Sequence, residues 1–171
     1  MHTFAPDEKS SPVMIYTSSL LVYGELVSKD NIRVSTWLRT DSAPECLYLR
    51  KPTIVNLVSN PPKVSKYEEI YLPRAQVTSI HLTPPACDPV DYDDGEKNRI
   101  MQPVTILVGT FIFNGHLRIS TRVDLCTSFV TMHSTWISAY DVKVSNPLLP
   151  RMGEVHVPML IMRPDLVSFA L

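Results

Sequence analysis

The amino-acid sequence predicts an all-β protein made of two tandem copies of one small unit, and three observations lead to this prediction. The stretch Ile32–Thr36, which reads IRVST, recurs 85 residues later as LRIST at Leu117–Thr121. The chain holds 15 prolines in 171 residues, and they separate short apolar runs, because a residue without an amide hydrogen interrupts helices and sheet ladders. These runs are rich in β-branched and aromatic residues, which favour strands.

Composition and charge exclude several classes of protein. The apolar share of 44% is enough for a buried core, and no run approaches the roughly 18 apolar residues of a membrane-spanning helix. Residues 1–13 carry charges and prolines where a secretory signal needs an apolar run, so we expect a cytoplasmic protein with no membrane partner. The net charge of −1 gives no general attraction for nucleic acid. The three cysteines lack CxxC spacing, which argues against a disulfide framework or a zinc site.

Four segments are predicted from the distribution of prolines, charges and apolar runs. Residues 1–13 form a disordered tail, because they are polar and lack periodicity. Residues 14–83 form the first small β-barrel, and residues 103–171 form the second. Between them, residues 84–102 are acidic, contain prolines and have few apolar side chains, which is typical of a linker.

The elements of the first unit follow from local patterns. Residues 14–27 predict a strand that bends or bulges at Gly24. After a turn at residues 28–31, the apolar spacing over residues 34–38 favours one helical turn, capped by Ser35, over a strand. Four further strands are predicted, over residues 46–49, 53–58, 68–72 and 76–82.

The second unit restarts the same plan after the linker. Residues 104–113 predict a strand that contains Gly109, and Asn114–Gly115 has the composition of a hairpin turn. The motif then recurs within Leu117–Leu125. Four strands complete the unit, over residues 128–132, 135–144, 154–157 and 166–171.

The repeat predicts which positions serve the fold of both units. Three pairs of equivalent residues are assigned: Gly24 with Gly109, Arg33 with Arg118, and Glu69 with Glu154. The last strands of the two units align at Ser79 and Ser168. A residue kept in both copies more naturally serves what the copies share, which is their fold. We therefore expect each arginine to pair with the glutamate of its own unit.

The first unit also resembles a known family. The succession of Gly24-Glu25-Leu26, Arg33–Leu38 and Ile70–Arg74, leading to Val77–Ile80, resembles the small Sm-like, SH3-type barrels of bacterial proteins. The second unit fits the same pattern from Gly109 to Pro158. The resemblance implies two tandem SH3-like (Sm-like) small barrels, each with one short helical turn. The family has no assigned activity, so the resemblance concerns the fold.

No set of residues predicts catalysis, a metal site or a cofactor. The histidines at positions 81, 116, 133 and 156 stand singly, without HxH or HxxxH spacing. Cys126 and His133 suggest a nucleophile and its base, but no oxyanion element accompanies them. The acidic run over residues 91–95 lacks the register of a calcium loop. We therefore predict no catalytic residue, no cofactor and no metal.

Two functions are compatible with the sequence. The first is a non-enzymatic scaffold or protein-interaction module, which binds a protein partner or self-associates through exposed strand edges. The second is an RNA or single-stranded DNA binding module of Sm-like type, because basic and aromatic residues alternate around the helical turn. The contact residues of that alternative are Arg33, Trp37, Arg39, Arg50 and Lys51. The first function is favoured, because the repeat gives Arg33 a structural role.

Overall fold

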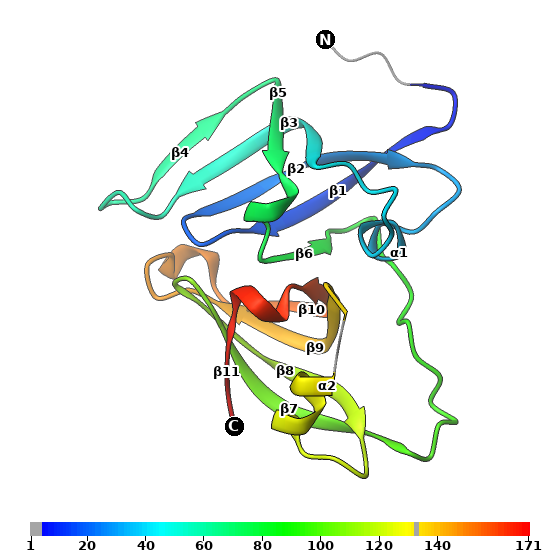
Figure 1. Ribbon diagram of the computed structural model, residues 1–171. Helices are drawn as coiled ribbons and strands as arrows, with labels where there is room; N and C mark the ends of the chain where they lie inside the picture. Colours follow the sequence, from blue (N-terminus) through cyan, green and yellow to red (C-terminus); the bar gives the residue numbers. More distant parts are fainter. Residues whose placement is uncertain (1–4, 132–133) are drawn as a thin grey trace. The chain divides into compact units, whose positions relative to one another are not determined.

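The chain folds into two compact units of antiparallel strands and short helices, unit 1 over Met1–Asp88 and unit 2 over Pro89–Leu171 (Figure 1). The structure is a computed structural model that describes residues 5–131 and 134–171. In this part of the chain, no helix has the length and apolar character needed to cross a membrane. The prediction of a mostly-β protein is confirmed.

Unit 1 is an antiparallel sheet with one α-helix. Its strands are β1 (Glu8–Tyr16), β2 (Leu20–Lys29), β3 (Cys46–Asn56), β4 (Lys63–Lys66), β5 (Glu69–Pro73) and β6 (Ser79–Leu82). Helix α1 (Val34–Leu38) connects β2 to β3, and the 3-10 helix η1 (Arg74–Gln76) precedes β6. The strands lie in the order β6-β1-β2-β3, and β4 and β5 both pair with β3.

Unit 2 repeats this plan. Its strands are β7 (Arg99–Val108), β8 (Phe111–Ser120), β9 (Ile137–Ser145), β10 (Val155–Met162) and β11 (Ser168–Ala170), in the order β11-β7-β8-β9-β10. Its helices are α2 (Leu125–Thr131), η2 (Pro150–Met152) and η3 (Pro164–Leu166). In both units an α-helix follows the second strand, a 3-10 helix precedes the last strand, and the last strand pairs with the first. Among the described residues, no strand pairing closes either sheet into a barrel.

Strand pairing relates the two units by an offset of 91 residues. Gly24 of β2 lies opposite Val13 of β1, and Gly115 of β8 lies opposite Val104 of β7. Gly24 therefore corresponds to Gly115, and the predicted pairing of Gly24 with Gly109 is wrong. Gly109 instead lies between β7 and β8 with a φ of 58°, a left-handed conformation that glycine adopts without steric cost.

The motif that suggested the repeat occupies different elements in the two units. The stretch Ile32–Thr36 leads into helix α1, whereas Leu117–Thr121 forms the end of strand β8. The predicted equivalence of Arg33 and Arg118 is therefore wrong, because Arg33 directly precedes a helix and Arg118 belongs to a strand. The alignment of Ser79 with Ser168 agrees with the structure, since both residues begin the last strand of their unit.

A β-bulge opposite the shared glycine is the second feature common to both units. The bulged residue of the third strand has a positive φ, 46° at Lys51 and 53° at Asp141. A Cβ atom on Gly24 would lie 3.2 Å from a backbone carbonyl oxygen of β3. A Cβ atom on Gly115 would lie 3.0 Å from a backbone carbonyl oxygen of β9 and 2.8 Å from a side chain. A side chain at Gly115 would therefore require its neighbours to move, and the space at Gly24 is tight.

Each unit has its own apolar core on one face of its sheet. In unit 1, the most deeply buried residues of the core strands include Val13, Ile15, Leu26, Leu47 and Leu49. In unit 2, they include Ile106, Val108, Phe113, Ala139 and Val142. The alternation of buried and exposed residues along these strands follows from the two-residue period of side-chain direction in a strand. Each unit also buries one tryptophan, Trp37 or Trp136.

The predicted segment boundaries need two corrections. Residues 8–13 belong to strand β1, although they were assigned to a disordered tail. They pair with residues 24–29 of β2, so their polar side chains lie on a strand whose backbone hydrogen bonds are satisfied. Residues 99–102 belong to strand β7, although they were assigned to the linker. Residues 84–98 contain no helix or strand.

Local elements of unit 2 also differ from the prediction. Residues 128–131, predicted as a strand, belong to helix α2, and Met132 lies outside the described residues. The helix is stabilised at its start by Asp124, which accepts a hydrogen bond from the Thr127 amide at 2.7 Å. Asn114–Gly115, predicted as a hairpin turn, lies inside β8 because its glycine meets the bulge of β9. In unit 1, helix α1 is confirmed, but the N-cap is Arg33 rather than Ser35.

Candidate functional site

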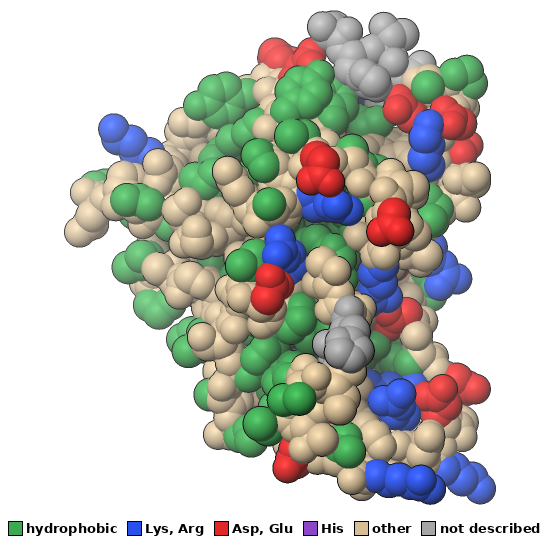
Figure 2. Space-filling model, in the orientation of Figure 1, with side chains coloured by type: hydrophobic (Ala, Val, Ile, Leu, Met, Phe, Trp, Pro, Cys, Tyr) green, Lys and Arg blue, Asp and Glu red, His purple; other side chains and the backbone are tan. Residues whose placement is uncertain are grey.

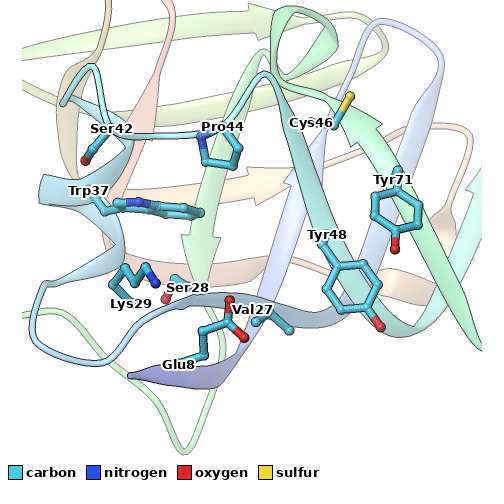
Figure 3. Close-up of a pocket in the computed structure, with 10 residues that line it drawn as sticks. All are labelled: Glu8, Val27, Ser28, Lys29, Trp37, Ser42, Pro44, Cys46, Tyr48 and Tyr71. Carbon is cyan, nitrogen blue, oxygen red and sulfur yellow. The ribbon is translucent and has the colours of Figure 1, made fainter. Parts of the chain in front are cut away.

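A pocket of about 300 Å³ opens on unit 1 (Figure 3). It is bounded by strands β1, β2, β3 and β5, by helix α1 and by the loop over residues 39–45. Its lining residues are Glu8, Val27, Ser28, Lys29, Trp37, Ser42, Pro44, Cys46, Tyr48 and Tyr71. Its volume is at the lower end of the range of small-ligand sites, so it suits a single side chain or a small group.

Aromatic rings form much of the pocket wall. Tyr48 and Tyr71 lie opposite each other on β3 and β5, and their ring centroids are 5.0 Å apart at an interplanar angle of 33°. Figure 3 shows this pair on one side of the pocket and Trp37 with Pro44 on the other. Tyr71 is 61% exposed, whereas Trp37 is 5% exposed. Tyr71, which packs on the half-buried Tyr48, is therefore the most accessible of these aromatic rings.

A buried hydroxyl group in the pocket wall lacks a hydrogen-bond partner. Ser28 is 3% exposed, and its Oγ atom makes no hydrogen bond within the described part of the chain. Buried polar groups in folded proteins are nearly always hydrogen-bonded, because leaving one unsatisfied is costly. A hydroxyl can both donate and accept. The hydrogen-bonding capacity of the Ser28 hydroxyl is therefore unused within the described part of the chain.

Negative charge predominates around the Lys29 ammonium. Lys29 Nζ lies 2.6 Å from Asp7 Oδ2, and this contact raises the pKa of Lys29 and lowers the pKa of Asp7. Glu8 and Asp30 also raise the pKa of Lys29 through their charges. Three carboxylates thus act on one ammonium at this edge of the pocket, which favours a cationic ligand and disfavours an anionic one.

The equivalent face of unit 2 is covered by the chain itself. Asp91 accepts hydrogen bonds from Ser138 Oγ at 2.7 Å and from the Tyr140 hydroxyl at 2.6 Å. The Tyr92 ring packs edge-on against the Tyr140 ring, with centroids 4.8 Å apart. The Arg118 guanidinium lies 4.6 Å from the Tyr92 ring centroid. The segment over residues 91–96, predicted as free linker, is therefore fixed to the sheet.

Arg118 is the centre of this cover. Its side chain is only 10% exposed, and its guanidinium lies 3.2 Å from the Glu96 carboxylate. It also donates a hydrogen bond to the Asp93 carbonyl oxygen. The predicted pairing of Arg118 with Glu154 is wrong, since Glu154 lies 3.5 Å from Lys143. Arg118 is thus largely buried, and its contacts are with residues 91–96 rather than with the predicted glutamate.

The residues of the nucleic-acid alternative lie on two separate elements. Arg33 and Arg39 flank helix α1 and are exposed, and Trp37 between them is buried. Arg50 and Lys51 belong to β3, where Arg50 lies in register with Glu25 of β2 and Glu69 of β5. The pairing of Arg33 with Glu69 stays a prediction. The buried indole offers no surface for stacking a base, and carboxylates flank Arg50.

No described cluster supports a metal or a catalytic pair. Within residues 5–131 and 134–171, no group of three or more His, Cys, Asp or Glu side chains is placed to hold a metal ion. Cys126 is exposed on helix α2, and His133 lies outside the described residues. His81 is buried in unit 1, where its Nε2 atom lies 3.0 Å from the Tyr16 hydroxyl and its Nδ1 atom 2.8 Å from the Leu82 carbonyl oxygen. Burial lowers the pKa of His81.

A second pocket lies in unit 2, and it has fewer groups available for binding a ligand. It has a volume of about 620 Å³ and lies beside Phe129 and Phe169, whose ring centroids are 4.3 Å apart. Its charged groups neutralise each other, because Arg163 donates to both carboxylate oxygens of Asp165. We therefore regard the pocket of unit 1 as the candidate site.

The chain matches no protein-family model, no curated protein sequence and no solved structure. The candidate site therefore stands on its own geometry. Sequence reasoning found Trp37 but not Tyr71, Ser28 or Glu8, because the pocket joins residues far apart in the chain. The one available signal was the alternation of Cys46, Tyr48 and Arg50, which places a tyrosine on the exposed face of a strand.

Proposed function

We propose that this protein is a cytoplasmic, non-enzymatic interaction module that binds partner polypeptides in the pocket of unit 1. The observation that carries the proposal is the Tyr48–Tyr71 pair, of which Tyr71 is exposed, in the same pocket as the buried, unpartnered Ser28 hydroxyl. Exposed aromatic rings are enriched at protein interfaces because they bury large areas and lose little conformational entropy. A main-chain group of a polypeptide supplies the hydrogen bond that Ser28 lacks.

The proposal includes a fold assignment, that each unit is a small SH3-like (Sm-like) barrel. The strand order supports it, with the last strand beside the first and a 3-10 helix before the last strand in both units. Small β-units of this kind present their faces and loops to ligands. The pocket of unit 1 lies where the loop over residues 39–45 meets the sheet.

Polypeptide is favoured over nucleic acid by charge. Phosphate groups need a basic surface, but the charges of Asp7, Glu8 and Asp30 all act on Lys29, and Glu8 lines the pocket. Figure 2 shows basic and acidic side chains interspersed, with no continuous basic surface on the face in view. Nucleic acid is therefore not part of the proposal.

Pairing of strand edges between copies is disfavoured at β4. This outermost strand of unit 1 has four residues, and two of them are Lys63 and Lys66. Short edge strands that carry lysine resist pairing with another strand, because the ammonium groups would be brought together and desolvated. At β4 this favours a different polypeptide as the partner, which binds through side chains rather than through an added strand.

Selection from a random peptide-display library tests this function. The full chain should enrich peptides that lose binding to the Tyr71→Ala variant and keep binding to the Tyr67→Ala variant. Tyr67 is a suitable control because it is 54% exposed and does not line the pocket. Failure to enrich any peptide that depends on Tyr71 would contradict the proposal.

A further inference from the structure

The two units differ at one equivalent position on the same sheet face. Val27 and Arg118 are each the third residue after the glycine of their unit, Gly24 or Gly115. In unit 2 the Arg118 guanidinium is held by a tyrosine ring and a carboxylate of residues 91–96. In unit 1 Val27 lines an open pocket. The same face is therefore filled by the chain in one unit and open in the other.

Unit 2 shows what chemistry this face accommodates. The Arg118 guanidinium lies 4.6 Å from the Tyr92 ring centroid and 3.2 Å from Glu96, and it donates to the Asp93 carbonyl oxygen. A guanidinium suits such a site because it stacks on aromatic rings and donates several hydrogen bonds in one plane. The groups that bind it are a tyrosine, a carboxylate and an oxygen acceptor.

The pocket of unit 1 offers the same three kinds of group. Tyr48 and Tyr71 provide the rings, and Ser28 provides an oxygen acceptor that has no other partner. The carboxylate of Glu8 lines the pocket. Asp7, Glu8 and Asp30 all act on Lys29. The second ammonium of this region, Lys9, donates to the Asp30 and Ile32 carbonyl oxygens, so three carboxylates face two ammonium groups. Among the described lining residues, none is an arginine.

We propose that the pocket of unit 1 is a binding site for an arginine side chain of a partner polypeptide. The guanidinium stacks on the Tyr48–Tyr71 pair, donates a hydrogen bond to Ser28 Oγ and compensates the charge of the carboxylates around Lys29. This inference rests on the proposed function and specifies the chemistry of the partner.

Other ligands satisfy fewer of these groups. A lysine ammonium compensates the charge but lacks the planar surface that stacks on tyrosine. A quaternary ammonium stacks on aromatic rings but cannot donate to Ser28. A phosphate or carboxylate ligand is repelled by the excess negative charge. Arginine is the common side chain that meets all three requirements.

Thiol protection tests the proposal on the full wild-type chain. Cys46 lines the pocket, whereas Cys87 and Cys126 are exposed elsewhere and serve as internal controls. Alkylation by iodoacetamide would be followed at each cysteine by mass spectrometry. The probes are the blocked pentapeptide Gly-Ser-Arg-Ser-Gly and its analogues with citrulline or lysine in place of arginine. Citrulline keeps the shape of arginine and removes its charge.

The arginine peptide should slow alkylation of Cys46 severalfold and leave Cys87 and Cys126 unchanged. The citrulline peptide should bind at least about tenfold more weakly, as expected when a charge-assisted hydrogen bond is lost. The lysine peptide should fall between them. Protection should disappear in Tyr71→Ala and persist in Tyr71→Phe, which keeps the ring. The comparison of arginine with citrulline needs no variant, so it does not depend on variant folding.

Three outcomes would overturn the proposal: no protection by the arginine peptide at tens of millimolar, equal protection by citrulline, or protection that survives Tyr71→Ala. The display selection separates this failure from that of the proposed function. Enriched peptides that depend on Tyr71 but lack arginine would overturn the arginine inference and leave the interaction function intact. The absence of any such peptide would remove both.

Discussion

Helices α1 and α2 occupy the same place in their units, yet their first turns are stabilised differently. In unit 2 Asp124, the residue before the helix, accepts a hydrogen bond from the Thr127 amide at 2.7 Å. The corresponding residue of unit 1 is Arg33, whose side chain makes no such bond. Asp88, distant in the sequence, accepts a hydrogen bond from the Ser35 amide at 3.0 Å instead. In unit 2 the residue next to the helix stabilises its first turn, whereas in unit 1 Asp88, the last residue of the unit, does so.

The exposed sheet faces show a related difference. Unit 2 covers its face with residues 91–96, held by Arg118, Ser138 and Tyr140. Unit 1 leaves the equivalent face open as a pocket. The two units thus share one arrangement of strands, but residues 91–96 cover the sheet face in unit 2, whereas a pocket is open on the equivalent face of unit 1. Four predictions test how far this comparison extends.

The largest effect on stability is expected at the equivalent glycines of the two units, Gly24 and Gly115. Gly115→Ala should lower the free energy of unfolding by about 2 to 3 kcal/mol, because the added methyl overpacks against β9. Gly24→Ala should cost about 1 kcal/mol, since its nearest neighbours would be 3.2 Å away rather than 2.8 Å.

Chemical denaturation followed by tryptophan fluorescence measures each unit separately. Trp136 reports on unit 2 in a Trp37→Phe background, and Trp37 reports on unit 1 in a Trp136→Phe background. A larger loss for Gly24→Ala than for Gly115→Ala would contradict the strand geometry.

The second effect concerns the cover of unit 2. Arg118→Met keeps the apolar stem but removes the bonds to Glu96 and Asp93, and it should cost unit 2 about 2 kcal/mol. It should also speed trypsin cleavage after Lys97, because the segment loses its attachment. Arg122→Met, a change at an exposed arginine, is the matched control and should leave the cleavage rate unchanged. An unaltered rate in Arg118→Met would show that Asp91 alone holds the segment.

The third effect is a pH dependence confined to unit 1. Burial lowers the pKa of His81 below its unfolded value of about 6.5. As pH falls below about 6.5 the unfolded chain takes up a proton that the folded unit resists, so stability decreases with a slope of at most about 1.4 kcal/mol per pH unit. His81→Leu should flatten this slope, as measured by denaturation between pH 7 and 5. An unchanged slope would exclude His81 as its source.

The smallest effect tests the two helix caps. Asp88→Ala should cost unit 1 about 1 kcal/mol, because the first turn of α1 loses its acceptor. Asp124→Ala should lower the melting temperature of unit 2. Arg33→Asp places an acceptor where unit 2 has Asp124, and it should restore the stability lost in Asp88→Ala. Thermal denaturation of the double variant decides the point, since no recovery would mean that the two helix starts are not equivalent.

The sequence allowed the all-β class, the duplication and helix α1 to be predicted, but not the register of the repeat. All five positions in IRVST and LRIST are identical or similar, and this short contiguous match had more weight in the alignment than a longer, dispersed one. At the structural offset of 91, several identities are two residues apart, such as Val13 and Ile15 with Val104 and Ile106. Strands conserve one face at a time, so a contiguous motif is a poor guide to their alignment.

The candidate site was less predictable than the fold. Its walls come from segments spread between Glu8 and Tyr71, and each segment reads locally as an ordinary strand or turn. Ser28 becomes unusual only when packing buries its hydroxyl without a partner. The cover of unit 2 was missed for the same reason, since an acidic, proline-bearing run resembles a free linker until an arginine and two hydroxyl groups bind it.

The attachment of Asp88 to helix α1 determines where the chain can be divided for study. A fragment that ends at residue 83 would retain every strand of unit 1 but lack the acceptor for its helix. A fragment that begins at residue 103 would lack the first four residues of β7 and the whole cover of unit 2. Only Pro89 and Val90 lie between Asp88 and Asp91. Separate expression of the two halves should therefore join Asp88 to the first and Asp91 to the second.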